Sequence, residues 1–425
     1  MSIITLSPEQ RAVAADVKAK RNILVTGPAG SGKSTLLNYF RSTYGAKLSV
    51  AASTGIAALN VGGTTLHSFA GLGLGKREAS EIASDIMGDK KSRAFRNITQ
   101  CHILAVDEIS MVSGQLLDKT DEVFRRVRRN HAPFGGIQVI FFGDFLQAPP
   151  ISKEDEPASF AFESRVWKQA EVATRMLTKV FRQADQAFAD ALGRLRVGDI
   201  NHPSIALIAS RNNLPIPNDG IRPVKLHTHN ADVERLNMAE LAKVDGKELS
   251  FEARETGDHS YKEKLDRDCL APRVLRLKKG AQVMLLTNLN LDEGLVNGSL
   301  GTVIDLKEDE ILVRFGINKV IKMERHTWAI QNNGVNLASR EQYPLRLAYA
   351  LTIHKCQGMT LDRIECWLGD NVFEYGLAYV AVSRCKTLSG LFLRRSSRKA
   401  FRAHPKALAF YEEAARQVGQ MEFAA

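Results

Sequence analysis

The chain has 425 residues, of which 44% are hydrophobic and 7% aromatic, so it can bury a large core and should divide into several domains. Its formal charge of +11 favours an anionic polymer as partner over a small acidic metabolite. The five cysteines show no metal-type or disulfide-type spacing, and no apolar run reaches the roughly 18 residues of a membrane span. We therefore expect a cytoplasmic protein, of a bacterium or a phage-infected host, that binds no membrane.

The first expected element is a helix from residue 7 to about residue 19. Ser7 is its N-cap, Pro8 occupies the first helical position, and Gln10 completes a capping box. Gln10 also lies just upstream of a glycine-rich loop, where its amide could contact adenine. Both interpretations of Gln10 remain open.

A buried strand at residues 23–25 leads into GPAGSGKST, which matches the pattern GxxxxGK[ST] before a helix. Glycines allow successive N–H groups to surround a phosphate at the positive end of that helix. Lys33 should reach the β- and γ-phosphates, and the Ser34 hydroxyl should reach Mg²⁺. The nucleotide-binding set is Gly27, Ala29, Gly30, Ser31, Gly32, Lys33, Ser34 and Thr35.

A second strand is expected at residues 48–52, and it ends in small and polar residues. In doubly wound sheets, ligands bind at the carboxyl ends of the strands. Phe69 could stack on a base, although a buried Phe in a glycine-rich loop is the alternative. Residues 71–97 should form a small helical or loop insert. The polar residues suited to phosphate oxygens are Thr54, Thr64, Thr65, His67 and Ser68.

A third strand, residues 103–106, delivers Asp107 and Glu108 to the same rim as Lys33. Asp107 should hold Mg²⁺ and Glu108 should polarise an attacking water, unless the two are a solvated surface pair. A further strand at residues 137–142 precedes Gln147, which could bond the γ-phosphate or that water.

The pattern changes after residue 157. A strand at residues 174–177 leads to Arg182, which either stabilises a transferring phosphoryl group from a second domain or is a surface arginine. A strand at residues 224–226 precedes Thr228 and Asn230, and residues 262–279 look weakly structured.

Between residues 282 and 331 the hydrophobic period becomes two, which predicts a small β-barrel inserted in the second α/β domain. The α/β pattern returns at residue 343. One short segment then carries Thr352, His354, Lys355, Gln357 and Gly358, which combine phosphate-binding side chains with a backbone donor. Arg384 precedes a strand at residues 391–394. A last helix is expected at residues 405–418.

Seven motifs occur in order: GPAGSGKST, ASTGIAALNVGGTTLHSF, VDEISMV, GDFLQAPP, VFRQ, LTIHKCQGMTLD and YVAVSRCKT. Together they resemble the superfamily 1 DNA helicases of the Pif type, the branch that includes RecD and moves 5′ to 3′. The resemblance covers nearly the whole chain. It implies two RecA-like domains with parallel sheets, ATP between them, and an SH3-like β-barrel accessory domain.

The implied first domain is residues 1–175, with a wedge-like insert at 71–97. Residues 176–235 and 341–425 would form the second domain, around an accessory domain at 236–340. The resemblance also implies that Gln10 contacts adenine, that Arg182 and Arg384 reach the γ-phosphate, and that Gly358 closes that side. It places Thr54, His67, Thr352, His354 and Lys355 along the single strand. The other expected DNA contacts are Thr65, Ser68, Phe69, Thr228 and Asn230.

The implied activity is ATP- and Mg²⁺-dependent unwinding of tailed or forked duplexes by translocation 5′ to 3′ on single-stranded DNA. The protein would be a monomer in solution that could self-associate on DNA. A translocase that displaces proteins with little unwinding is the alternative within this class. A P-loop small-molecule kinase and a non-catalytic nucleic-acid-binding module are the alternatives from other classes.

Overall fold

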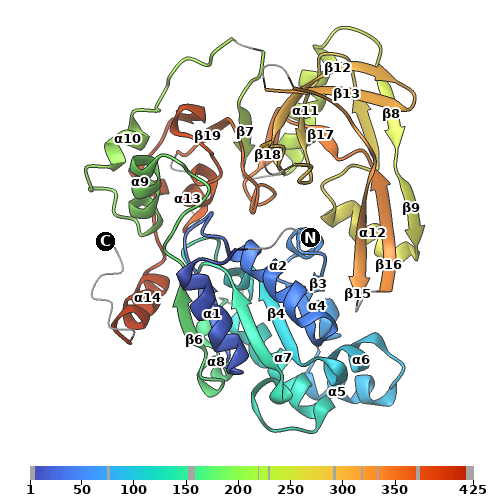
Figure 1. Ribbon diagram of the computed structural model, residues 1–425, viewed down its shortest axis with the longest axis vertical. Helices are drawn as coiled ribbons and strands as arrows, with labels where there is room; N and C mark the ends of the chain where they lie inside the picture. Colours follow the sequence, from blue (N-terminus) through green and yellow to red (C-terminus); the bar gives the residue numbers. More distant parts are fainter. Residues whose placement is uncertain are drawn as a thin grey trace.

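The structure is a computed structural model that describes residues 5–73, 77–151, 158–218, 220–227, 230–290, 293–316, 319–332, 335–369 and 374–417. Figure 1 shows an N-terminal α/β domain below, a second α/β domain above it, and a β-rich accessory domain beside the second. None of the helices within these ranges is both long and apolar enough to cross a lipid bilayer.

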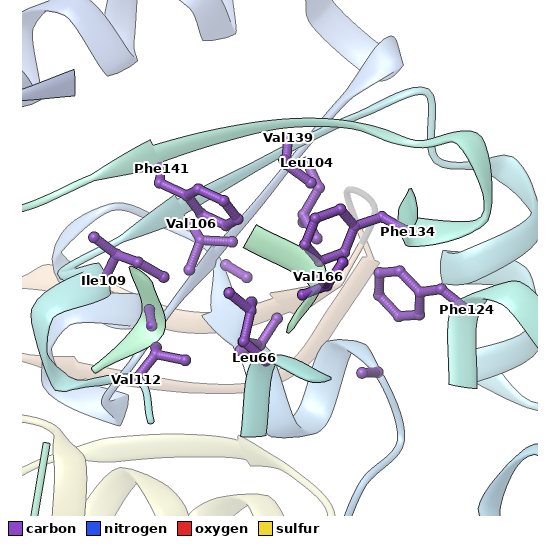
Figure 2. Close-up of a cluster of buried hydrophobic side chains, with 14 of the residues drawn as sticks. Leu66, Leu104, Val106, Ile109, Val112, Phe124, Phe134, Val139, Phe141 and Val166 are labelled. Atoms are coloured by element: carbon purple, nitrogen blue, oxygen red, sulfur yellow. The ribbon is translucent and has the colours of Figure 1, made fainter. Parts of the chain in front are cut away.

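The first domain is built on a six-stranded sheet in the order β3-β2-β4-β5-β1-β6, and all of its pairings are parallel. Alternate strand residues face two separate cores, because side chains point to opposite faces along a strand. Leu24 and Phe141 face one core, shown in Figure 2, while Ile23 and Phe142 face the other. The strands are β1 (Ile23–Thr26), β2 (Leu48–Ala52), β3 (Thr64–Thr65), β4 (Ile103–Asp107), β5 (Gln138–Phe142) and β6 (Ala173–Met176).

Helices cover both faces of this sheet. Ser7 caps α1 and forms the expected capping box with Gln10, which confirms the N-terminal helix. The insert at residues 71–97 is helical in its described part, as expected. The helices are α1 (Pro8–Lys18), α2 (Lys33–Tyr44), α3 (Gly55–Asn60), α4 (Leu66–Phe69), α5 (Ala79–Gly88), α6 (Arg93–Gln100), α7 (Gly114–Arg128) and α8 (Arg165–Gln169).

The second domain has a four-stranded parallel sheet in the order β18-β7-β19-β20. Its strands come from both sides of the accessory segment, so that segment is an insertion. The two parallel sheets confirm the expected fold class. The elements are α9 (Gln186–Arg196), α10 (Ile205–Ala209), β7 (Val224–His227), α11 (Asn230–Ala242), β18 (Ala350–Thr352), β19 (Ile364–Trp367), α13 (Leu377–Val382) and β20 (Leu391–Arg394).

The accessory domain departs from a closed barrel. Its main antiparallel sheet has the order β14-β13-β12-β11-β17, and no pairing among the described residues joins β14 to β17. The expected fifth strand, β15, instead joins a separate sheet with β16 and β9. The elements of the main sheet are β11 (Gln282–Leu285), β12 (Leu300–Lys307), β13 (Glu310–Phe315), β14 (Lys319–Lys322) and β17 (Leu345–Leu347).

One further expectation for this region needs correction, and one boundary can be placed differently. Residues 262–279 are ordered rather than weakly structured, since α12 (His259–Asp268) and β10 (Val274–Leu277) occupy most of them. β17 pairs with β11, so we propose that the accessory domain extends past residue 340 to residue 347. The remaining strands are β8 (Leu249–Glu252), β9 (Arg254–Gly257), β15 (His326–Asn332) and β16 (Val335–Gln342).

The last helix, α14 (Pro405–Gln417), returns to the first domain. Ala407 and Tyr411 belong to the first-domain core, and the Phe410 ring stacks on Phe162 with centroids 4.4 Å apart. Figure 1 shows α14 beside β6 and α8. We therefore propose that this helix be assigned to the first domain rather than to the second.

Candidate active site

The loop between β1 and α2 forms a hollow that only glycine can line at several positions. Gly27, Gly30 and Gly32 have φ values of 146°, 82° and 87°. A Cβ at Gly27 would lie 2.2 Å from the Leu177 carbonyl oxygen, and one at Gly30 would lie 2.5 Å from the Arg182 Cβ. No side chain in the described residues caps α2, so its first N–H groups are available to an anion. The loop fits a nucleotide phosphate.

Lys33 turns its ammonium back onto this loop. Its Nζ donates to the carbonyl oxygens of Gly27 at 2.6 Å and Pro28 at 3.0 Å. Desolvation lowers the pKa of Lys33 to about 8, and the nearby carboxylates of Asp144 and Glu108 act in the opposite direction. The ammonium is therefore already in place to exchange carbonyl oxygens for phosphate oxygens.

Asp107 and Glu108 stand at the carboxyl end of β4, as the sequence predicts. Glu108 has φ 52°, a left-handed conformation that costs a non-glycine residue energy and is often found at functional sites. Desolvation, and next the charge of Glu108, raise the pKa of Asp107 to about 7, and desolvation also raises the pKa of Glu108. A divalent cation would relieve this crowding of negative charge.

The oxygen donors of this site suit Mg²⁺, which also binds phosphates and water, better than a metal held only by protein side chains. Ser34 and Asp107 line one cleft, yet the described residues contain no cluster of three or more His, Cys, Asp or Glu side chains that could hold a metal. Mg²⁺ commonly uses one or two protein oxygens and completes its shell with phosphates and water. The site thus suits Mg²⁺ held jointly with a nucleotide.

The second domain reaches the first domain across this site. Gln357 Nε2 donates to Glu108 Oε2 at 3.0 Å, and the N–H of Ala29 donates to the Tyr379 hydroxyl at 2.9 Å. The two domains thus meet at both the acidic pair and the phosphate loop.

Arg182 and Arg384 lie together on that side. Arg182 donates to the Ser383 carbonyl oxygen at 3.1 Å, and Arg384 donates to the Ser383 hydroxyl at 3.1 Å. Desolvation and the neighbouring charge of Arg384 lower the pKa of Arg182 to about 9. Two close cations in a desolvated place favour binding of an anion.

A cleft of about 530 Å³ connects these parts. Its wall includes residues of both α/β domains and of the accessory domain, the last represented by Trp328. Residues expected at the nucleotide and residues expected at DNA therefore line one continuous space. The lining residues that the sequence predicts for these roles are Lys33, Ser34, Thr54, Asp107, Glu108, His354 and Gly358.

The side chains of Gln10 and Gln147 are both held by hydrogen bonds. Gln10 Oε1 accepts from the Ser7 N–H at 2.9 Å, and its Nε2 donates to the Gly32 carbonyl oxygen at 3.3 Å. The capping interpretation is thus confirmed, and the adenine contact stays a prediction. Gln147 is buried and donates to Asp144 Oδ2 at 3.3 Å.

One predicted DNA contact is wrong. Phe69 is 1% exposed, and its ring packs edge-on against Phe124 with centroids 6.1 Å apart. Since α4 turns Phe69 into the core, its face is not available to a base. The alternative of a buried Phe was the correct one.

The other predicted DNA contacts fall into three groups. Thr54 and Thr65 are helix N-caps whose hydroxyls accept from the N–H groups of Ala57 and Ser68. Thr352 is buried and accepts from the Lys355 N–H at 3.3 Å. Their contacts with DNA remain predictions. His67, Ser68, His354 and Lys355 are half-buried, Thr228 lies outside the described residues, and so does the Asn230 side chain.

Several side chains at the domain junction are absent from the predicted set. Asp144 follows β5 and binds Arg196, which ends α9. The position of Asp144 at the end of a strand could have marked it as a site residue. No helix was expected at residues 186–196, and no local pattern marks Arg196 as buried. Tyr379 and Tyr411 are likewise identified only by their contacts in the fold. Gln357 was expected among phosphate-binding side chains, and the structure places its amide on Glu108.

Comparison with known proteins gives one consistent result. Residues 5–204 match the PIF1-like helicase family, and residues 260–306 match the 2B domain of DNA helicase Pif1. The ATP-dependent DNA helicase PIF1 of Homo sapiens is 41% identical over 412 residues. That alignment covers 96% of this chain and 63% of the human protein, so the chain spans less than two thirds of that relative.

Solved structures agree. The Bacteroides sp. Pif1 in complex with ADP-AlF4 is 31% identical, with a TM-score of 0.84 and 98% coverage of both chains. The Bacteroides Pif1 bound to ssDNA is 32% identical at the same coverage, with a TM-score of 0.66. By TM-score the chain is thus more similar to the ADP-AlF4 complex than to the ssDNA-bound structure.

Proposed function

This chain belongs to the PIF1-like helicase family, and from that membership and the cleft geometry we propose that it is an ATP-dependent DNA helicase. It would use ATP with Mg²⁺, translocate 5′ to 3′ on single-stranded DNA, and unwind tailed or forked duplexes. The observation that carries the proposal is the hydrogen bond from Gln357 to Glu108. This bond links Glu108, which is expected to polarise water, to the segment of the second domain that is expected to contact DNA.

Within this proposal, the first domain holds the nucleotide. The phosphate-loop N–H groups and Lys33 bind the phosphates, Ser34 and Asp107 hold Mg²⁺, and Glu108 accepts a proton from the attacking water. Mg²⁺, when bound, supplies positive charge that neutralises the β- and γ-phosphate oxygens. Gln10 would contact adenine, and Thr35 would follow Ser34 at the phosphates.

The second domain completes the site. Arg182 and Arg384 would reach the γ-phosphate when the domains are closed, an effect that is worth about 10³ to 10⁵ in rate where such arginines are used. Gly358 lets the backbone approach on the same side. Hydrolysis would remove the anion that holds these arginines, so the domains reopen and one grip on the strand loosens.

The DNA track would run over the rims of both sheets. Thr54, Thr65, His67 and Ser68 would contact it from the first domain. From the second domain, Thr352, His354 and Lys355 would contact it, together with Thr228 and Asn230. Contacts of this kind to phosphate fix position rather than sequence. Because the chain also carries a formal charge of +11, binding should weaken with salt. We propose a monomer that can self-associate on DNA.

A strand-separation assay tests the proposal. Duplexes with a 5′ tail or a 3′ tail are incubated with ATP and Mg²⁺, and Lys33→Ala serves as the inactive control. Unwinding of the 5′-tailed duplex alone is expected. Unwinding from the 3′ tail alone would overturn the polarity, and translocation without strand separation would favour a protein-displacing translocase.

A further inference from the structure

A buried ion pair joins the two α/β domains behind the phosphate loop. Arg196, the last residue of α9, donates from Nε to Asp144 Oδ2 and from Nη2 to Asp144 Oδ1, both at 2.8 Å. The two side chains are 6% and 0% exposed. Asp144 follows β5 in the first domain, whereas α9 packs in the second-domain core. This pair is therefore a contact between the domains.

Both partners stay charged in spite of their burial. Burial alone would raise the pKa of Asp144, but the Arg196 guanidinium outweighs it and the pKa lies below its ordinary value. The pKa of Arg196 is correspondingly raised. The two parallel bonds fix direction as well as charge, and a lysine could supply only the charge.

The Asp144 carboxylate also accepts hydrogen bonds from the segment that carries Gln147. Its Oδ2 accepts from Gln147 Nε2 at 3.3 Å, and its Oδ1 accepts from the Leu146 N–H at 3.2 Å. Of the charges that favour the ammonium form of Lys33, that of Asp144 is the strongest. The carboxylate thus lies between the second domain and two residues of the nucleotide site.

Tyr411 of α14 holds the same carboxylate from the other side. Its hydroxyl donates to Asp144 Oδ1 at 3.3 Å, accepts from the Phe145 N–H at 3.0 Å, and shares a 2.6 Å hydrogen bond with Thr26 Oγ1 of β1. The Arg196 guanidinium lies over its ring at 5.3 Å. The C-terminal helix therefore closes a three-residue node, Asp144–Arg196–Tyr411.

Helix α9 links this node to the arginines of the nucleotide site. Gln183, just before α9, donates to the carbonyl oxygens of Ser383 at 3.3 Å and Cys385 at 3.0 Å, which flank Arg384. The 11 residues of α9 span about 16 Å as a rigid element. A shift of the second domain must move both ends of α9 together.

We propose that Arg196 is a positioning residue, which acts through Asp144 and with Tyr411 to hold Gln147 where hydrolysis requires it. The node makes ATP turnover depend on how the second domain is seated on the first. This inference rests on the proposed function, because it assigns a means of coupling to the same nucleotide site.

The test compares Arg196→Lys with Arg394→Lys. Arg394 donates to Glu365 at 2.9 Å in a pair whose side chains are 18% and 6% exposed. The pair lies within the second domain, so it is a control for the loss of an arginine ion pair. Steady-state kcat and KM for ATP are measured with saturating single-stranded DNA, alongside the Tm. Arg196→Lys should lower kcat about tenfold or more relative to Arg394→Lys, while KM for ATP changes little. The substitution displaces Gln147 but leaves the groups that bind ATP in place.

A kcat for Arg196→Lys equal to that of Arg394→Lys would overturn the inference. If Arg196→Lys fails to fold, Tyr411→Phe decides, because it keeps the ring and removes only the hydroxyl. A several-fold loss of kcat at constant KM then supports the node, and an unchanged kcat overturns it. The failure of the proposed function would show differently, as a wild-type protein without DNA-stimulated turnover.

Discussion

Replacing Gly376 with alanine should uncouple the domains without unfolding either of them. Gly376 precedes α13 with φ 74°, and its Cα faces the backbone that carries Gln147. An added Cβ would lie 2.4 Å from the Gln147 carbonyl oxygen and 2.6 Å from that of Leu146. Because ordinary contact begins at 3.4 Å, one backbone must move by about 1 Å.

A misplacement of that size can cost about 10²-fold in rate, which corresponds to about 2.8 kcal/mol of transition-state stabilisation. The left-handed conformation adds a backbone cost of about 1 kcal/mol that affects stability instead. Gly294→Ala isolates that cost, since Gly294 has φ 72° with nothing within 4 Å of its would-be Cβ.

The assay is DNA-stimulated phosphate release, with kcat and KM for ATP determined for the wild type and both variants, and thermal unfolding recorded in parallel. We expect Gly376→Ala to lose about 10²-fold in kcat while both variants lose similar stability. Equal kcat values for Gly376→Ala and Gly294→Ala would refute the importance of this contact.

Four further predictions follow from named contacts. Glu108→Gln should lower kcat by about 10² to 10⁴ while nucleotide still binds, measured by phosphate release and nucleotide titration, and normal turnover would exclude Glu108 as the base. Phe69→Ala should destabilise the chain by about 3–5 kcal/mol in urea unfolding because Phe69 is a core residue, and a loss of DNA affinity at unchanged stability would instead restore its stacking role. Since desolvation lowers the pKa of Lys33 to about 8, its ammonium is lost as pH rises through that value, so KM for ATP should increase between about pH 7 and pH 9, and a constant KM would contradict this. Burial raises the pKa of Cys101 to about 11 and those of Cys356 and Cys385 to about 12, so these thiols should resist a disulfide reagent at about pH 8 until the chain is unfolded, and rapid labelling of the native protein would show that the core opens.

The sequence predicted the parts of the fold that depend on local pattern. Strands β1, β2, β4 and β5 of the first sheet and β20 of the second are short apolar runs, and the phosphate loop follows from its glycines, so these were predictable. Strands β3, β18 and β19 were not predicted, and β3 is only two threonines long. The same holds for Asp107 and Glu108, because the end of a parallel strand places them at the rim.

The features that the sequence did not predict depend on tertiary contacts. Whether Phe69 faces solvent or core depends on how α4 is rotated against Phe124, which no local signal specifies. In the accessory domain β15 pairs with β16 and not with β14, a choice of partner that the period-two pattern does not specify. Arg196 and Tyr411 are remote in sequence from Asp144, so only the folded chain brings them together.

The central claim is that the nucleotide site is shared by two domains and responds to DNA. The most direct test is the rate of ATP turnover at saturating ATP and Mg²⁺ as single-stranded DNA is added. A rise of at least several-fold that saturates with DNA is predicted, and it should disappear in Glu108→Gln. A turnover rate that DNA leaves unchanged would contradict the claim.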